Sequence, residues 1–138
     1  MLKFDLNWLH IGALSLANFF IGFAWYSLLF NKIWIKALKI TPKDMHSDKA
    51  KAMMPRLMGT AALSAVLMSL GCQVLVSNLG AADAASGALA GFFFAVVLVA
   101  AHESGSLFER RPTVVFGISA LHAIAILSLD SAALAAWH

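Results

Sequence analysis

Four long apolar runs dominate this chain of 138 residues and constrain its fold more than any other feature. The runs cover about residues 6–30, 57–79, 84–101 and 114–137. An α-helix needs roughly 20 apolar residues, with a usual range of about 17–25, to cross the hydrocarbon core of a bilayer. All four runs fall in this range, so the sequence predicts four transmembrane helices in a single transmembrane domain spanning residues 1–138.

The composition agrees with a membrane environment. Hydrophobic residues make up 61% of the chain and charged residues 12%, whereas soluble domains carry roughly 25% charged residues. Helices satisfy their own backbone hydrogen bonds in lipid, where water cannot. We therefore expect an all-α membrane protein, folded as an antiparallel four-transmembrane-helix bundle with no soluble catalytic domain.

Basic residues are distributed unevenly between the gaps that separate the runs. Of the ten Lys and Arg residues, all but Lys3 lie in the linker 31–56 or at Arg110 and Arg111. Lys and Arg concentrate on the cytoplasmic side of membrane proteins. The charge pattern thus predicts a multi-pass protein of the bacterial cytoplasmic (inner) membrane with both termini outside. No nucleic-acid-binding motif accompanies the positive charge.

The linker 31–56 has a helical pattern of its own. Four lysines recur at spacings of 4, 3 and 4, which would put them on one face of an amphipathic helix: Lys32, Lys36, Lys39 and Lys43. We expect this interfacial helix, between spans one and two, to lie on anionic lipid headgroups, with about 1 kcal/mol of attraction per basic residue. The alternative is a docking surface for a protein partner. Thr41-Pro42-Lys43-Asp44 predicts the start of a second short helix.

Several polar residues interrupt the apolar runs and form a candidate polar path: Ser15, Asn18, Gln73, His122 and Asp130. At 1.5 Å per residue, Asn18 lies ~15 Å inward of Trp8, and His122 lies about 22 Å inward of Trp137. Unpaired polar groups are costly in hydrocarbon. We therefore expect these side chains to face the interior of the bundle.

Two interpretations of the candidate polar path remain open. In the structural one, Asn18–His122 and Gln73–Asp130 are interhelical hydrogen bonds worth about 0.6–1 kcal/mol each. In the functional one, His122 and Asp130 belong to a polar path open to the outside, in an oligomeric small-solute or ion transporter or channel.

Small residues at four-residue steps predict close helix packing. Gly87 and Gly91 would let backbones approach, either within the hairpin of spans two and three or between copies of the chain. The favoured function is therefore a small membrane component that self-associates, as a homo-oligomer, or serves as an accessory subunit of a larger membrane complex.

No pattern of residues predicts a catalytic or cofactor site. The single cysteine, Cys72, cannot form an internal disulfide. The five histidines are scattered along the chain, which argues against a metal site. Phosphate-binding loops, haem motifs and nucleophile–base pairs are missing from the sequence. We therefore expect a protein that is not an enzyme and that has no cofactor or metal.

Three segments resemble a family of small bacterial four-helix membrane proteins of unknown function. They are Asn7-Trp8-Leu9, the stretch from Trp25-Tyr26-Ser27 to Phe30-Asn31-Lys32-Ile33-Trp34, and Leu107-Phe108-Glu109-Arg110-Arg111-Pro112. The resemblance implies the fold and the location, but no chemistry. It also implies a shared cluster at the cytoplasmic face, here called the inner-face cluster: Trp25, Tyr26, Lys32, Trp34, Phe108, Glu109 and Arg110.

Glu109 is the expected centre of the inner-face cluster. In an antiparallel bundle, the end of span one, the interfacial helix and the start of span four meet at one level. At the headgroup level, we expect Glu103 and Glu109 to pair with Arg110, Arg111 or Arg56. We further expect Glu109 to bond Lys32, Arg110 or a backbone N–H, and so to hold the interfacial helix against the bundle. The alternative is that Glu109 is a solvated loop charge.

Overall fold

The computed structural model describes residues 1–137, and no strand occurs among them. In chain order the elements are α1 (Trp8–Ala24), the π-helical turn η1 (Trp25–Leu29), α2 (Asn31–Ala37), α3 (Pro42–Met45), α4 (Asp48–Leu79), α5 (Ala84–Phe108) and α6 (Thr113–Ala136). Four helical segments are long and apolar enough to cross a membrane: Trp8–Leu29, Asp48–Leu79, Ala84–Phe108 and Thr113–Ala136.

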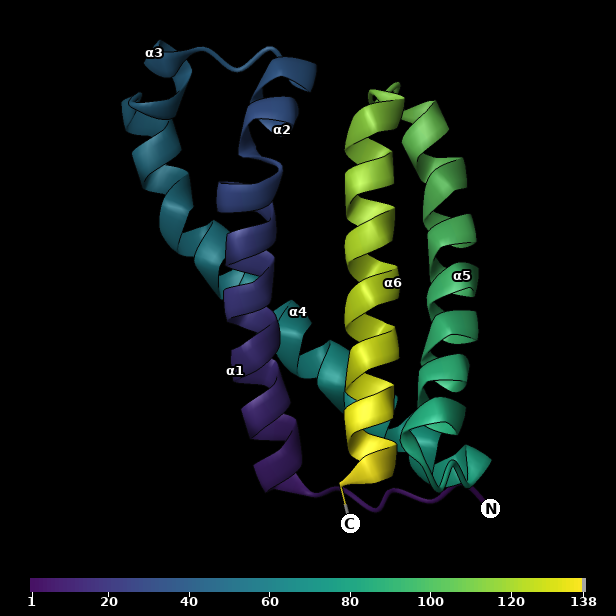
Figure 1. Cartoon of the computed structure of the whole chain (residues 1–138). Helices are drawn as coiled ribbons and strands as arrows, with labels where there is room; N and C mark the ends of the chain where they lie inside the picture. The colour runs from purple at the N-terminus through teal and green to yellow at the C-terminus, as the bar shows by residue number, and fades with distance from the viewer. Residues whose placement is uncertain (138) are drawn as a thin grey trace.

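The long helices run up and down in turn between two ends of the molecule (Figure 1). The N-terminal segment, the turn between α4 and α5, and the last turn of α6 lie at one end, here called the terminal end. Helices α2 and α3, the start of α4, and the turn between α5 and α6 lie at the other, here called the basic end. All Lys and Arg residues except Lys3 belong to the segments at or near the basic end.

Helices α5 and α6 are the most closely packed pair of helices in the fold. A Cβ atom added at Gly91 would stand 2.2 Å from the carbonyl oxygen of Leu127, and one at Gly87 would stand 2.3 Å from that of Ser131. Only glycine allows the two backbones to approach this closely. The two glycines therefore join spans three and four, and their expected use in the hairpin of spans two and three is wrong.

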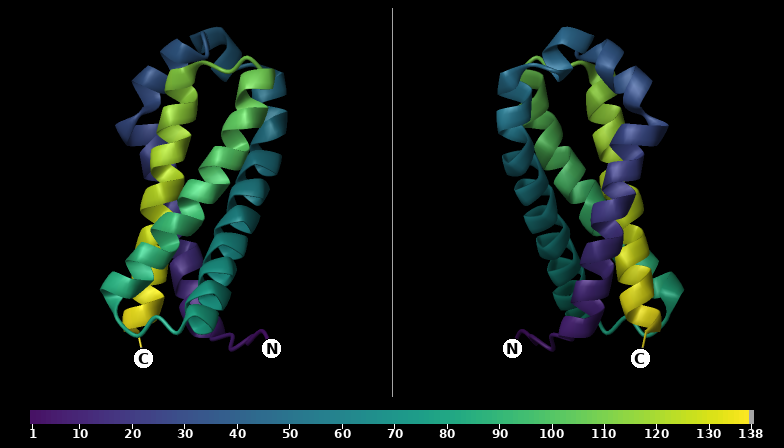
Figure 2. Two further views of the ribbon diagram at one scale, coloured as in Figure 1. Left: turned by 90° about the vertical axis from the view of Figure 1, so that its right-hand side faces the viewer. Right: turned by 90° about the vertical axis from the view of Figure 1, so that its left-hand side faces the viewer.

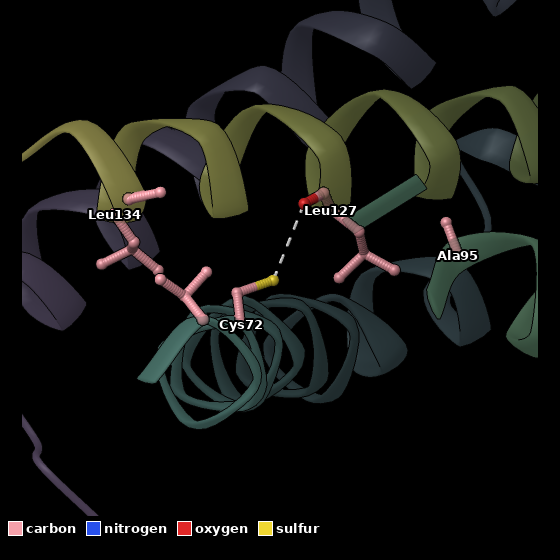
Figure 3. Packing of buried hydrophobic residues seen from close by; sticks show 6 residues of the cluster. Cys72, Ala95, Leu127 and Leu134 are labelled. Atoms are coloured by element: carbon pink, nitrogen blue, oxygen red, sulfur yellow. Dashed lines mark hydrogen bonds between the residues drawn. The ribbon is translucent and has the colours of Figure 1, made fainter. Parts of the chain in front are cut away.

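Helix α4 crosses the bundle obliquely (Figures 1 and 2). Its buried residues lie on one face of its C-terminal half: Ala65, Ser69, Cys72 and Val76. Figure 3 shows the Cys72 sulfur directed at the carbonyl oxygen of Leu127, at 3.8 Å, in the core formed with α5 and α6. The N-terminal half of α4 stands apart from α5 and α6, and residues 51–64 are all exposed.

Residue sizes are distributed as expected for helices packed in lipid. The buried faces carry mostly small or polar residues, whereas large apolar side chains such as Leu16, Phe20 and Phe93 are exposed. In a bilayer, large apolar side chains gain nothing by leaving lipid, while small ones let helices pack closely.

The first helix of the segment between the first two spans is shorter than the expected amphipathic helix. Helix α2 ends at Ala37, and Lys39 has a left-handed backbone with φ of 54°. Lys32 and Lys36 share one helix, but Lys39 and Lys43 lie beyond its end. The predicted face of four lysines is therefore wrong, because the chain turns after one short helix.

The predicted helix start at Thr41 is confirmed. The Thr41 hydroxyl accepts a hydrogen bond from the backbone N–H of Asp44, and the Asp44 carboxylate accepts one from the backbone N–H of Thr41. This reciprocal capping box satisfies two free donors at the start of α3. The carboxylate also accepts a bond from the Thr41 hydroxyl, and these bonds lower the pKa of Asp44 below its usual value.

Two long helices extend further than their apolar runs. Helix α4 begins at Asp48, with Ser47 as its N-cap, so the end of the predicted linker 31–56 is helical. Helix α5 continues to Phe108, past the predicted end of the third run at residue 101. Polar helical turns thus extend both spans at the basic end.

Candidate functional site

Three polar side chains from three different helices meet in the interior. The side-chain nitrogen of Asn18, on α1, donates to the Asp130 carboxylate on α6 at 2.6 Å and to the Ser69 hydroxyl on α4 at 3.0 Å. The Ser69 hydroxyl donates in turn to the same Asp130 oxygen at 3.1 Å. All three residues are buried. We call Asn18, Ser69 and Asp130 the polar triad.

The helical spacing of α1, α4 and α6 brings the polar triad together. Asn18 follows Ile11 and Ser15 on the buried face of α1, and Ser69 lies one turn after Ala65 on that of α4. Because buried polar groups in lipid must find partners within the protein, the triad links the three helices at one level. Each of the three side chains is hydrogen-bonded to the other two.

The pairs expected from the sequence are wrong. Asn18 contacts Asp130 instead of His122, and Asp130 contacts Asn18 and Ser69 instead of Gln73. Residue spacing gives the depth of Asn18 and Asp130 along their helices, but it does not give the direction of a side chain around the helix axis. Ser69 is not among the residues of the candidate polar path predicted from the sequence. Its place on the face shared with Ala65 and Cys72 is the signal that could have found it.

Ser15 and Gln73 do not join the polar triad. The Ser15 hydroxyl donates to the carbonyl oxygen of Ile11 in its own helix, at 2.6 Å. Gln73 lines a separate hollow at the terminal end, and its buried Oε1 has no hydrogen-bond partner. The five residues of the candidate polar path are therefore spread over separate environments.

His122 lies nearer the basic end, among aromatic rings of the π-helical turn. Its ring centroid is 5.5 Å from that of Trp25 and 5.3 Å from that of Tyr26. Its Nε2 atom is buried without a hydrogen-bond partner and faces Gly22, where an added Cβ would stand 3.5 Å away. Glycine at position 22 therefore gives the imidazole room against α1.

The π-helical turn holds the two aromatic residues against α6. The indole N–H of Trp25 donates to the carbonyl oxygen of Ile118 at 3.2 Å, and the Tyr26 hydroxyl donates to Ser119 at 3.3 Å. Single π-helical turns often occur at functional sites. Here the turn allows the consecutive residues Trp25 and Tyr26 both to contact the same helix.

The inner-face cluster divides into two parts. Trp25, Tyr26 and Trp34 lie together, and the rings of Tyr26 and Trp34 are 5.0 Å apart. Glu109 forms an ion pair with Arg111 at 2.5 Å, with both side chains about half exposed.

The other members of the inner-face cluster make no such contacts. Phe108 is 90% exposed. Within residues 1–137, neither Lys32 nor Arg110 forms an ion pair. Arg110 instead takes a left-handed backbone, with φ of 53°, in the turn between α5 and α6. The ion pair with Arg111 confirms one of the partners expected for Glu109 at this level. Glu109 does not reach α2, however, and its expected bond to Lys32, Arg110 or a backbone N–H is wrong.

A cavity of about 480 Å³ lies between α1 and η1 on one side and residues 57–68 of α4 on the other, and α6 also contributes to its wall. Its lining includes the buried residues Asn18, Ala65 and Ile126 and the exposed residues Phe23 and Leu57. The cavity therefore runs from the surface to the polar triad. His122 also lines it. Within residues 1–137 no three His, Cys, Asp or Glu side chains gather closely enough to hold a metal ion.

Comparison with known families identifies the chain at the level of the family. Residues 9–135 match the family described as "Protein of unknown function (DUF1761)", and the chain belongs to this family. This confirms the resemblance seen in the sequence to a family without a known function. Searches of the curated proteins and of the solved structures found no significant match.

Proposed function

We propose that this member of a family of unknown function is a small subunit of the bacterial inner membrane that works through contacts with other membrane helices, in a homo-oligomer or as an accessory subunit. Its four apolar helices would span the bilayer as an antiparallel bundle with both termini outside. No catalytic reaction, cofactor or metal is assigned to it.

The placement of charge supports this orientation. Helices α2 and α3 and the turn between α5 and α6 are at the same end (Figure 1), and these segments carry basic residues such as Lys36, Lys43 and Arg111. Positive charge of this kind favours the cytoplasmic side and attracts anionic lipid headgroups. Helix α2 would then lie at the cytoplasmic interface.

The observation that carries the proposed function is the unpacked N-terminal half of α4. Gly59 and Leu63 lie one helical turn apart on its outer face: Leu63 is exposed, and a Cβ at Gly59 would meet no atom within 4 Å. An apolar helix face that also presents small residues is the kind that packs against another membrane helix. We propose that a second copy of the chain, or a partner subunit, packs on this face.

The rival proposal is a small-solute or ion transporter or channel. The cavity between α1 and α4, which reaches Asn18 and His122, favours it. The closed hydrogen bonds of the polar triad count against a continuous path, because Asn18, Ser69 and Asp130 bond one another across the interior. Ion flux into liposomes that depends on His122 and Asp130 would favour the transporter.

Cysteine crosslinking in native membranes tests the contact on α4. The Cys72→Ser background removes the only native thiol. Leu63→Cys on the exposed half of α4 should give a disulfide-linked dimer or a crosslink to a partner. Leu121→Cys, exposed on α6, is the matched control and should give neither. Equal crosslinking at both positions, or none at either with a monomer in mild detergent, would contradict the proposed contact.

Reporter fusions test the orientation independently. A reporter that is active only outside the cytoplasm should be active after residue 137 and inactive in the loop around Ser47. Reversed activities would overturn the proposed topology without bearing on self-association.

A further inference from the structure

The cavity between α1, α4 and α6 lies on a different side of α4 from the proposed contact face. The proposed self-association does not use this cavity. We propose that it is a binding site for a quinol, a hydroxylated ring with an apolar tail that dissolves in the membrane. The site requires the proposed membrane placement but not self-association.

The position of the cavity limits what can reach it. Its surface residues Phe23 and Leu57 belong to two candidate membrane spans, so lipid would surround its opening. Its inner end at Asn18 is ~15 Å along the helix from Trp8. Phospholipids keep their headgroups at the interface, whereas a molecule dissolved in the hydrocarbon can bring a compact polar group to this depth.

The inner end of the cavity offers hydrogen-bonding groups that the protein leaves unused. Both hydrogen bonds of the Asn18 side chain use Nδ2, so its Oδ1 remains an acceptor. The imidazole of His122 lines the cavity and makes no hydrogen bond at Nε2. A neutral imidazole can donate or accept according to its tautomer. A hydroxyl group can donate to Asn18, and the imidazole can pair with the same or a second hydroxyl.

The walls fit a flat ring. Phe19, Phe23 and Tyr26 line the cavity from α1 and η1, and Met58 and Met68 line it from α4. Aromatic rings stack on flat ligands, and thioether side chains adapt to irregular shapes. The volume of about 480 Å³ lies within the range of roughly 300–1,000 Å³ typical of small-molecule sites. The tail would leave between Phe23 and Leu57 into the lipid.

Equilibrium binding in lipid nanodiscs tests the site. The probe is tritiated decylhydroquinone, kept reduced under anaerobic conditions, and empty phosphatidylcholine nanodiscs measure its partition into lipid. Decylbenzene, which has the same tail and ring without hydroxyls, is the matched ligand. We expect saturable binding of decylhydroquinone, at least tenfold tighter than that of decylbenzene.

Three variants locate the bound probe. Ala61 lines the cavity, so Ala61→Phe should fill it and weaken binding at least tenfold. Ala62, its neighbour on α4, lines a different groove, so Ala62→Phe adds the same bulk elsewhere and should leave binding unchanged. His122→Phe keeps a ring in place but removes the imidazole, and it should weaken decylhydroquinone binding tenfold while leaving decylbenzene unaffected.

Several results would overturn the site. Equal affinity for the two probes would show that the cavity is filled by any apolar molecule. Unchanged binding in folded Ala61→Phe would place the probe elsewhere. If Ala61→Phe does not fold, His122→Phe decides, and unchanged decylhydroquinone affinity in that variant rejects the site. Because crosslinking at Leu63→Cys is measured without the probe, failure of the quinol site and failure of the α4 contact are distinguishable.

Discussion

The amide nitrogen of Asn18 lies 2.6 Å from the carboxylate of Asp130, although 112 positions separate the two residues in the chain. This contact joins the first and last spans, and Ser69 connects both to α4. Interhelical hydrogen bonds in membranes contribute modestly to stability, on average about 0.6 kcal/mol. Because hydrogen bonds are directional, this contact fixes the rotation of α1 relative to α6 about the helix axes.

The polar triad should behave as one unit in a double-mutant cycle. Asn18→Ala and Asp130→Ala should each lower the free energy of unfolding by about 1–3 kcal/mol, because each leaves a buried partner without its hydrogen bond. The double variant should show a coupling of roughly 0.5–1.7 kcal/mol. Denaturation in mixed detergent micelles measures these values. Ser15→Ala is the control on the same helix face, and with Asp130→Ala it should be additive within about 0.5 kcal/mol.

Glycine at position 91 should be essential to the packing of α5 on α6. In Gly91→Ala the added Cβ would meet the backbone carbonyl of Leu127 at 2.2 Å, so the helices must separate. We expect a loss of about 1–3 kcal/mol in the free energy of unfolding. The control is Gly117→Ala on α6, where an added Cβ meets nothing within 4 Å, and we expect it to be neutral or stabilising by up to about 1 kcal/mol. Equal stability of the two variants would contradict the close packing.

Tyr26 and Trp34 should be coupled, whereas Glu109 and Trp34 should not. The rings of Tyr26 and Trp34 are 5.0 Å apart, and aromatic pairs contribute about 0.5–1.5 kcal/mol beyond their buried area. Tyr26→Ala with Trp34→Ala should therefore be non-additive in thermal denaturation. Glu109→Gln with Trp34→Ala should be additive, because Glu109 pairs with Arg111 in the turn between α5 and α6. A non-additive effect of Glu109→Gln and Trp34→Ala would show that the inner-face cluster is one unit, and it would contradict the division described above.

The start of α3 should lose stability in acid. The Thr41 hydroxyl and backbone N–H hold the pKa of Asp44 below its usual value. Because the folded-state pKa is the lower one, the capping contribution is fully present above the unfolded-state pKa. It is lost as the pH falls through the folded-state pKa. Carbon NMR of the Asp44 carboxyl should show the lowered pKa in the wild type and in Thr41→Ser, and a pKa closer to the usual value in Thr41→Val.

The sequence by itself determined the four membrane-span-like helices, the family and the capped start at Thr41. Each of these depends on local information, namely run length, composition and residues within one turn of each other. The contacts between helices depended on the tertiary structure, because a rotation or oblique crossing of one helix changes which side chains meet. Hence Asn18 meets Asp130 instead of His122, Gly91 packs on α6 instead of α4, and Glu109, paired with its neighbour Arg111, does not reach Lys32. The cavity between α1 and α4 also depends on the tertiary structure, because it forms where these two helices diverge. The angle between the two helices cannot be predicted from a pattern of residues along the chain.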